Sequence, residues 1–202
     1  MIINEVHDRF TVKQKITLMV NRYEIRSVDA SGGEGPVIAV AQQKRMAFKE
    51  QVTFYADEAR TQPVFGFKAR QRLDLAATYD VTDAGGVSIG SFHKDFRKSL
   101  LRSTWQLTAT DGLMATGTER NLGVAIARRL WGFLPVVGEI ASPFLFHFDF
   151  TAPDGSIVLS SVRKRSLRDR YNVQLPASPN GWQLDWRVAA AMAVALDALQ
   201  GR

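Results

Sequence analysis

The sequence predicts a mainly β fold, a closed antiparallel barrel around one buried helix near the C-terminus. Apolar and polar residues alternate with period two along many short segments, and glycine- or proline-containing turns separate these segments. The last long segment, Trp182–Leu199, is instead apolar and rich in alanine. We expect one domain over residues 1–202, because β barrels often reach this length as single units.

The strands are predicted where β-branched and aromatic residues alternate with polar ones. Glycine permits positive φ and proline fixes a turn, so segments such as Ser31–Pro36 and Asp83–Gly86 are predicted to be turns. The predicted strands are, in order, Val12–Val20, Val37–Gln42, Phe48–Tyr55, Phe65–Arg70, Tyr79–Val81, Val87–Ile89, Thr104–Ala109, Phe144–Phe150, Ile157–Arg165 and Tyr171–Leu175.

Two helices are predicted. The first, Asn121–Leu134, is limited by Pro135. The second is Trp182–Leu199, in which Val188–Leu196 contains no polar residue. A helix that is apolar on all sides is buried, and its alanines allow the surrounding strands to approach closely. The alternative is a helix packed between a sheet and an oligomer partner.

Several short motifs carry a family resemblance. They are Gln42-Gln43-Lys44, the run from Tyr79 to Lys94, Trp105-Gln106-Leu107 and the terminal helix. With them the chain resembles the LURP-one-related proteins of the tubby C-terminal-like superfamily and, more distantly, the phospholipid scramblases. The resemblance implies a barrel of about twelve strands around a hydrophobic C-terminal helix. Related domains are associated with phosphoinositide binding, lipid scrambling and plant defence, but the calcium-binding and membrane-anchoring features of scramblases are not recognisable in this sequence.

One motif suggests catalysis. Gly86–Gly90 matches the G-x-S-x-G pattern of serine hydrolases, with Ser88 as nucleophile, His147 downstream, and Asp95 or Asp111 as the acid. That motif requires a strand-to-helix turn, whereas here its first glycine belongs to a predicted hairpin. We therefore predict no catalytic residue and a non-enzymatic domain, and a hydrolase is the least favoured alternative.

The composition argues against cofactors. Without cysteine the chain has no thiol nucleophile, disulfide, cysteine-ligated zinc or iron–sulfur cluster. The three histidines are far apart in the sequence, so no metal site and no cofactor are predicted. Neither a signal peptide nor an apolar stretch of about 18 residues is recognisable. We expect a cytoplasmic protein, peripheral to a membrane if it binds lipid.

Basic residues form three candidate sites for an anion or a lipid head group, and the net charge of +6 favours anionic partners. The alternative for each group is an ordinary solvated surface. The candidates are Lys68, Arg70 and Arg72 on one strand face; Lys94, Arg97 and Lys98, with Arg102; and Arg163, Arg165 and Arg168, with Lys164 and Arg170.

These observations favour a binding module for an anionic phospholipid head group or a membrane-proximal partner. The alternative is a protein-interaction or structural module without a lipid role, in which Leu130–Phe133 is an exposed docking element. Nucleic acid is not expected as a partner, because the aromatic residues follow the inward pattern and are not interleaved with the basic ones. The oligomeric state is left open.

Overall fold

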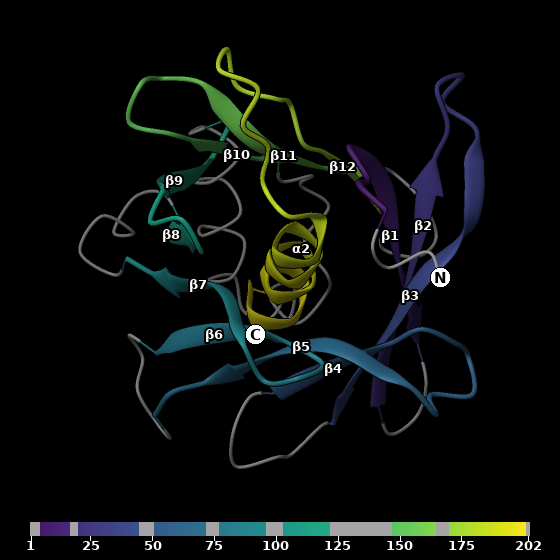
Figure 1. Cartoon of the computed structure of the whole chain (residues 1–202). Helices are drawn as coiled ribbons and strands as arrows, with labels where there is room; N and C mark the ends of the chain where they lie inside the picture. The colour runs from purple at the N-terminus through teal and green to yellow at the C-terminus, as the bar shows by residue number, and fades with distance from the viewer. Residues whose placement is uncertain are drawn as a thin grey trace, which may run out of the picture.

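In a computed structural model, the chain forms a closed barrel of antiparallel strands around one helix (Figure 1). The structure describes residues 5–16, 20–44, 51–71, 77–95, 103–121, 147–164 and 170–200. Within them, the helix is α2 (Trp186–Gln200) and the strands are β1 (Arg9–Ile16), β2 (Val20–Val28), β3 (Glu34–Lys44), β4 (Gln51–Tyr55), β5 (Pro63–Ala69), β6 (Thr78–Asp83), β7 (Ser88–Lys94), β8 (Thr104–Ala109), β9 (Met114–Glu119), β10 (His147–Thr151), β11 (Ile157–Lys164) and β12 (Arg170–Gln174).

The barrel closes because its first and last strands pair. Consecutive strands pair antiparallel from β1 to β12, and β1 also pairs with β12, from Arg9 opposite Gln174 to Lys13 opposite Arg170. Each described strand therefore has a partner on both sides, which removes the exposed edges of an open sheet. The predicted closed antiparallel barrel around a C-terminal helix is confirmed.

The inward-facing side chains pack onto α2, which fills the barrel. Every residue from Val188 to Leu196 is at most 1% exposed, and Val12, Phe54 and Leu107 on the surrounding strands are fully buried. Figure 1 shows the helix enclosed by the ring of strands. A helix without a polar face is stable in water only when all its sides are covered, and the barrel provides this cover.

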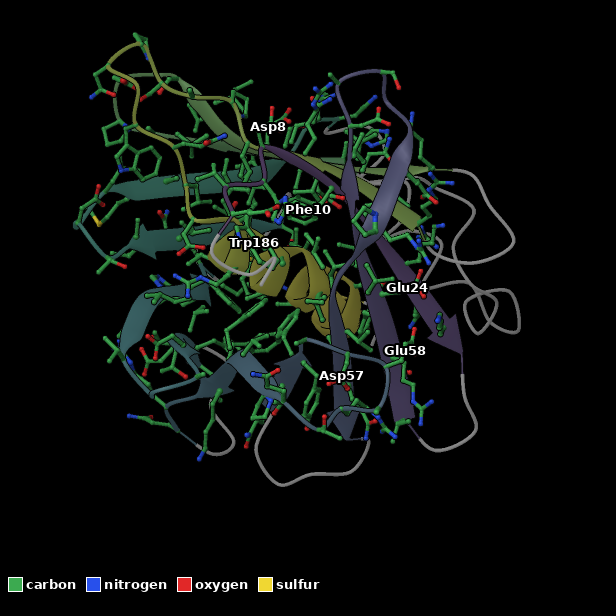
Figure 2. All side chains as sticks on the ribbon, turned by 45° about the vertical axis from the view of Figure 1, so that its right-hand side comes forward. Asp8, Phe10, Glu24, Asp57, Glu58 and Trp186 are labelled. Atoms are coloured by element: carbon green, nitrogen blue, oxygen red, sulfur yellow. The ribbon has the colours of Figure 1, made fainter. Side chains whose placement is uncertain are left out.

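Aromatic rings close the end of the barrel where α2 begins. The indole of Trp186 makes edge-to-face contacts with His7, Phe10 and Phe65, at ring-centroid distances of 5.1, 6.4 and 5.6 Å. Figure 2 shows Phe10 beside Trp186 at the start of the helix. These contacts join the N-terminal segment, β1 and β5 to the first turn of α2.

Near its other end, α2 is held by a buried polar contact. The Tyr23 hydroxyl donates to Asp197 Oδ2 at 2.9 Å, and the Tyr171 hydroxyl donates to Asp197 Oδ1. Both tyrosines are at most 1% exposed, so these donors satisfy a carboxylate that would otherwise be costly to enclose. The contact fixes the rotation and depth of α2 relative to β2 and β12.

Close packing explains why position 117 of β9 is a glycine. A Cβ atom at Gly117 would lie 2.3 Å from the ring of Phe150 on β10, so the ring occupies the space that a side chain would need. Gly117 lies opposite Phe150 in the β9–β10 pairing.

The structure corrects two strand predictions. A single strand over residues 12–20 is wrong, because β1 ends at Ile16 and Val20 begins β2, with no glycine or proline between them to signal a turn. No strand was predicted over β9, whose inward residues include Ala115 and Gly117, too small to produce an apolar stripe.

The C-terminal helix begins later than predicted. It starts at Trp186 and not at Trp182, because Asp185 caps it by accepting a hydrogen bond from the Arg187 backbone N–H at 2.8 Å. Most of the predicted helix Asn121–Leu134 and the start of the strand Phe144–Phe150 lie outside the described residues, which omit 122–146.

Replacing a helix residue tests the enclosure of α2. Ala190→Asp places an unpaired carboxylate at a fully buried position and should lower the free energy of unfolding by more than about 4 kcal/mol. Chemical denaturation monitored by circular dichroism measures this loss. Ala84→Asp, in the exposed β6–β7 turn, is the matched control and should leave stability nearly unchanged. Wild-type stability of Ala190→Asp would place α2 outside the core.

Candidate functional site

Because α2 fills the interior of the barrel, a binding site can lie only on the outer surface or at the barrel ends. Among the described residues, no helix combines the length and the hydropathy that a membrane span requires. The same part of the chain also lacks any group of three or more His, Cys, Asp or Glu side chains arranged to hold a metal ion.

The first predicted basic group lies at the end of β5, where exposed Lys68 and, just after the strand, exposed Arg70 flank the buried Ala69. Arg70 binds Asp80 of β6 through two guanidinium nitrogens, at 2.7–3.0 Å, so a neighbouring carboxylate compensates its charge. Lys68 lies opposite both Gln51 and Asp80 in the strand pairings. Arg72 lies outside the described residues.

The other two basic groups are only partly described. Lys94 ends β7 opposite the buried Trp105, and Arg163 lies opposite the buried Tyr171, so both take inward-facing register positions near the barrel end where α2 terminates. Cations at this end interact favourably with the C-terminus of α2, which is the negative end of its dipole. Lys164 is exposed on β11. Arg97, Lys98, Arg102, Arg165 and Arg168 lie outside the described residues.

A polar cluster lies on the outer face of β9–β11. Arg120 binds both carboxylate oxygens of Asp149, at 2.6 and 2.7 Å, and donates to Ser160 Oγ at 3.2 Å. This guanidinium holds the pKa of Asp149 below its usual value. Burial and then Arg120 lower the pKa of His147, although Asp149 on the same face favours the charged imidazole. The cluster is a compensated ion pair with a neutral histidine beside it.

The geometry does not support the serine hydrolase. Ser88 begins β7 after a hairpin turn and lies near Thr82 in an antiparallel pair, not on a strand-to-helix turn. His147 begins β10 at the barrel end where α2 terminates, whereas Ser88 lies at the end where α2 begins. The motif residues and the histidine are thus at opposite ends of the barrel.

The two barrel ends differ in charge. At the end where α2 begins, aspartates accept hydrogen bonds within their own turns; Asp83, for example, accepts from the backbone N–H groups of Gly85 and Val87, both at 2.9 Å. Such side-chain bonds are the reason that aspartate is favoured in turns. The acids in or beside these connections are Asp8, Asp29, Asp83, Asp111, Asp154 and Asp185, and the bases are Arg9 and Arg187. The β4–β5 connection, with Asp57, Glu58 and Arg60, lies instead against the outer face of β1–β3.

The opposite end is basic. The bases at or next to the ends of strands there include Lys68, Lys94, Arg163 and Lys164, and the acids include Asp95, Glu119 and, near the end of α2, Asp197. The connecting segments at this end lie mostly outside the described residues, and their sequence contains more bases than acids. The charge of the barrel is therefore unevenly distributed along its axis.

Sequence reasoning missed a charged network on the outer face of β1–β3. Glu24 is 6% exposed and accepts from Lys15 and Arg26, both at 2.5 Å. Lys15 also bridges to Glu58 of the β4–β5 connection at 3.0 Å. Figure 2 shows Glu24 and Glu58 on the same side of the barrel. No sequence signal joins these residues, because the network depends on the position of the β4–β5 connection.

A second carboxylate links three strands in the same region. Glu34, which begins β3, accepts from Thr11 and Lys13 of β1 at 3.2 and 2.6 Å. Arg170 of β12 approaches the same carboxylate at 2.7 Å. Lys13 is the main reason that the pKa of Glu34 is lowered. Arg170, one of the predicted basic residues, is therefore engaged within the barrel surface.

Comparison with known proteins gives one result. The family model described as LURP-one-related matches residues 37–197, from β3 to near the end of α2. No curated protein matches the chain.

The Arg120–Asp149 pair gives a pH prediction. Because the pKa of Asp149 is lowered in the folded state, the pair stabilises the fold above the ordinary aspartate pKa of about 4, and this contribution disappears as the pH falls through the folded-state value. Asp149→Asn should cost about 1 kcal/mol at pH 7, a value reduced by the exposure of Arg120. Urea denaturation should show this difference shrinking as the pH is lowered below the ordinary aspartate pKa of about 4. A difference that stays equal as the pH falls would contradict the assignment.

Proposed function

We propose that this chain, which belongs to the LURP-one-related family, is a non-enzymatic module that binds an anionic phospholipid surface with the barrel end where α2 terminates. Family membership suggests a domain without enzymatic activity. The finer proposal is supported by one observation, the uneven charge along the barrel axis.

The arrangement of the basic residues favours a flat partner over a small one. Lys68 on β5 and Lys164 on β11 are on opposite sides of the barrel, six strands apart in the closed order. They cannot converge on one small anion. Both are at or next to the strand ends at the same end of the barrel, however, so we infer that a planar surface across that end can contact both. A membrane leaflet rich in anionic lipid is such a surface, and each nearby base contributes about 1 kcal/mol.

The acidic end supports a single orientation of the protein on the membrane. Asp29 and Asp154 have pKa values below the ordinary one, each lowered first by a hydroxyl donor in its own turn, so they are charged at neutral pH. An anionic surface repels this end and attracts the other. The protein would then be peripheral to a cytoplasmic membrane surface, without lipid insertion.

The second candidate is a protein-interaction module that uses the acidic end. Val87 and Met114 are 64% and 60% exposed beside hairpin turns there, and Asp83 and Asp111 lie close to them in sequence. Exposed apolar residues beside acids suit a partner segment that is both apolar and basic. The candidate docking segment Leu130–Phe133 lies outside the described residues.

Vesicle co-sedimentation tests the membrane proposal. The protein should bind phosphatidylcholine vesicles that contain phosphatidylserine, should not bind pure phosphatidylcholine, and should detach as salt rises, because exposed charges are screened. Lys68→Gln and Lys164→Gln should each weaken binding about fivefold, equivalent to about 1 kcal/mol. Arg9→Gln, with the same loss of charge at the acidic end, is the control and should bind like wild type.

Two results would reject the proposal. One is a bound fraction that is indifferent to lipid charge and salt. The other is a loss of binding in Arg9→Gln as large as that in the lysine variants, which would show that net charge alone, and not the basic end, determines binding.

A further inference from the structure

Two arginines approach one glutamine on the outer face of the barrel. Arg22 of β2 lies directly opposite Gln42 of β3, and both alternate with inward-facing residues, so their side chains project outward. Arg60, in the connection between β4 and β5, donates a hydrogen bond from Nη1 to Gln42 Oε1. Gln42 thus neighbours two arginines from separate parts of the chain, one through a side-chain hydrogen bond and one through strand pairing.

The β4–β5 connection is built to place Arg60 there. Asp57 holds the loop by accepting from the Thr61 hydroxyl at 2.9 Å, and Glu58 reaches across to Lys15 of β1 at 3.0 Å. Arg60 itself has φ of 59°, the only positive value among the described residues other than glycine. This conformation is unfavourable for a residue other than glycine, and such strain clusters at functional positions.

The carboxylates nearby are already engaged. Glu24 pairs with Lys15 and Arg26, and Glu58 pairs with Lys15. Neither Arg22 nor Arg60 forms an ion pair in the described part of the chain, and the Nε atom of each is buried without a hydrogen-bond partner. Burying a donor without an acceptor is unfavourable, and so is placing two uncompensated guanidinium groups around one side chain.

We propose that Arg22, Gln42 and Arg60 form a binding site for a phosphate-type oxyanion, such as a phosphomonoester. Guanidinium groups bind phosphate oxygens through paired, charge-assisted hydrogen bonds. The carbonyl oxygen of Gln42 accepts a hydrogen bond from Arg60, and the NH₂ group of Gln42 can donate to the anion. Thr53, opposite Gln42 on β4, adds a hydroxyl to the same outer row.

The site is independent of the proposed membrane-binding end. It uses none of the lysines assigned to that end, and its three residues come from β2, β3 and one loop that lie side by side. Two sources share this chemistry, a soluble phosphate ester and the head group of phosphatidic acid.

Titration of the full chain with inorganic phosphate tests the site. Isothermal titration calorimetry should detect binding to wild type, and Arg22→Gln and Arg60→Asn should each weaken it by about tenfold, as expected for the loss of one charge-assisted contact. Asparagine tolerates positive φ, so Arg60→Asn keeps the loop conformation and serves if Arg22→Gln does not fold. Arg70→Gln, which removes the same charge from a compensated pair, is the control and should bind phosphate like wild type.

Phosphatidylcholine vesicles with and without phosphatidic acid identify the source. A preference for phosphatidic acid that is lost in Arg60→Asn identifies a lipid head group; phosphate binding without that preference identifies a soluble ester, and either result supports the site. The proposal is overturned if wild type does not bind phosphate, or if Arg22→Gln and Arg60→Asn both bind it as wild type does. A loss in Arg70→Gln equal to theirs overturns it as well. If Arg60→Asn weakens vesicle binding and Lys68→Gln does not, the proposed membrane-binding end is rejected and this site is retained.

Discussion

The enclosure of α2 by the strands is the constraint on which the rest of the structure depends. A helix whose residues from Val188 to Leu196 are all apolar cannot face water, and the apolar inner faces of the twelve strands need an apolar filling. The alanines keep the helix thin, while large side chains such as Phe54 and Phe92 project from the strands to meet it. Trp186 at one end and Asp197 at the other set its position.

This arrangement confines any binding site to the outside of the protein. With the interior filled, a partner could contact only the barrel ends and the outer faces of the strands. The short turns at one end require aspartates for their own hydrogen bonds, and this local need leaves that end acidic. Turn chemistry therefore accounts for the acidic character of that end.

The sequence predicts this architecture well because burial leaves a periodic signal. The uninterrupted apolar run of the last helix identifies the centre of the fold, and alternation identifies most strands. The ion-pairing of the surface was less predictable. Lys68 and Arg70 share the predicted outer face, but Asp80 compensates Arg70 only because β5 pairs with β6 in this register. The contact between Arg60 and Gln42 joins residues 18 apart and depends on one backbone angle, which no composition or periodicity reveals.

Native-state hydrogen exchange tests the enclosure most directly. If the strands must open before α2 is exposed, the amides of Val188–Leu196 should exchange only through global unfolding, with the same free energy as the slowest strand amides and as denaturant unfolding. Exchange of these helix amides at a clearly lower free energy than the amides of β1 and β12 would contradict the account. It would show that the helix leaves the barrel while the strands remain paired.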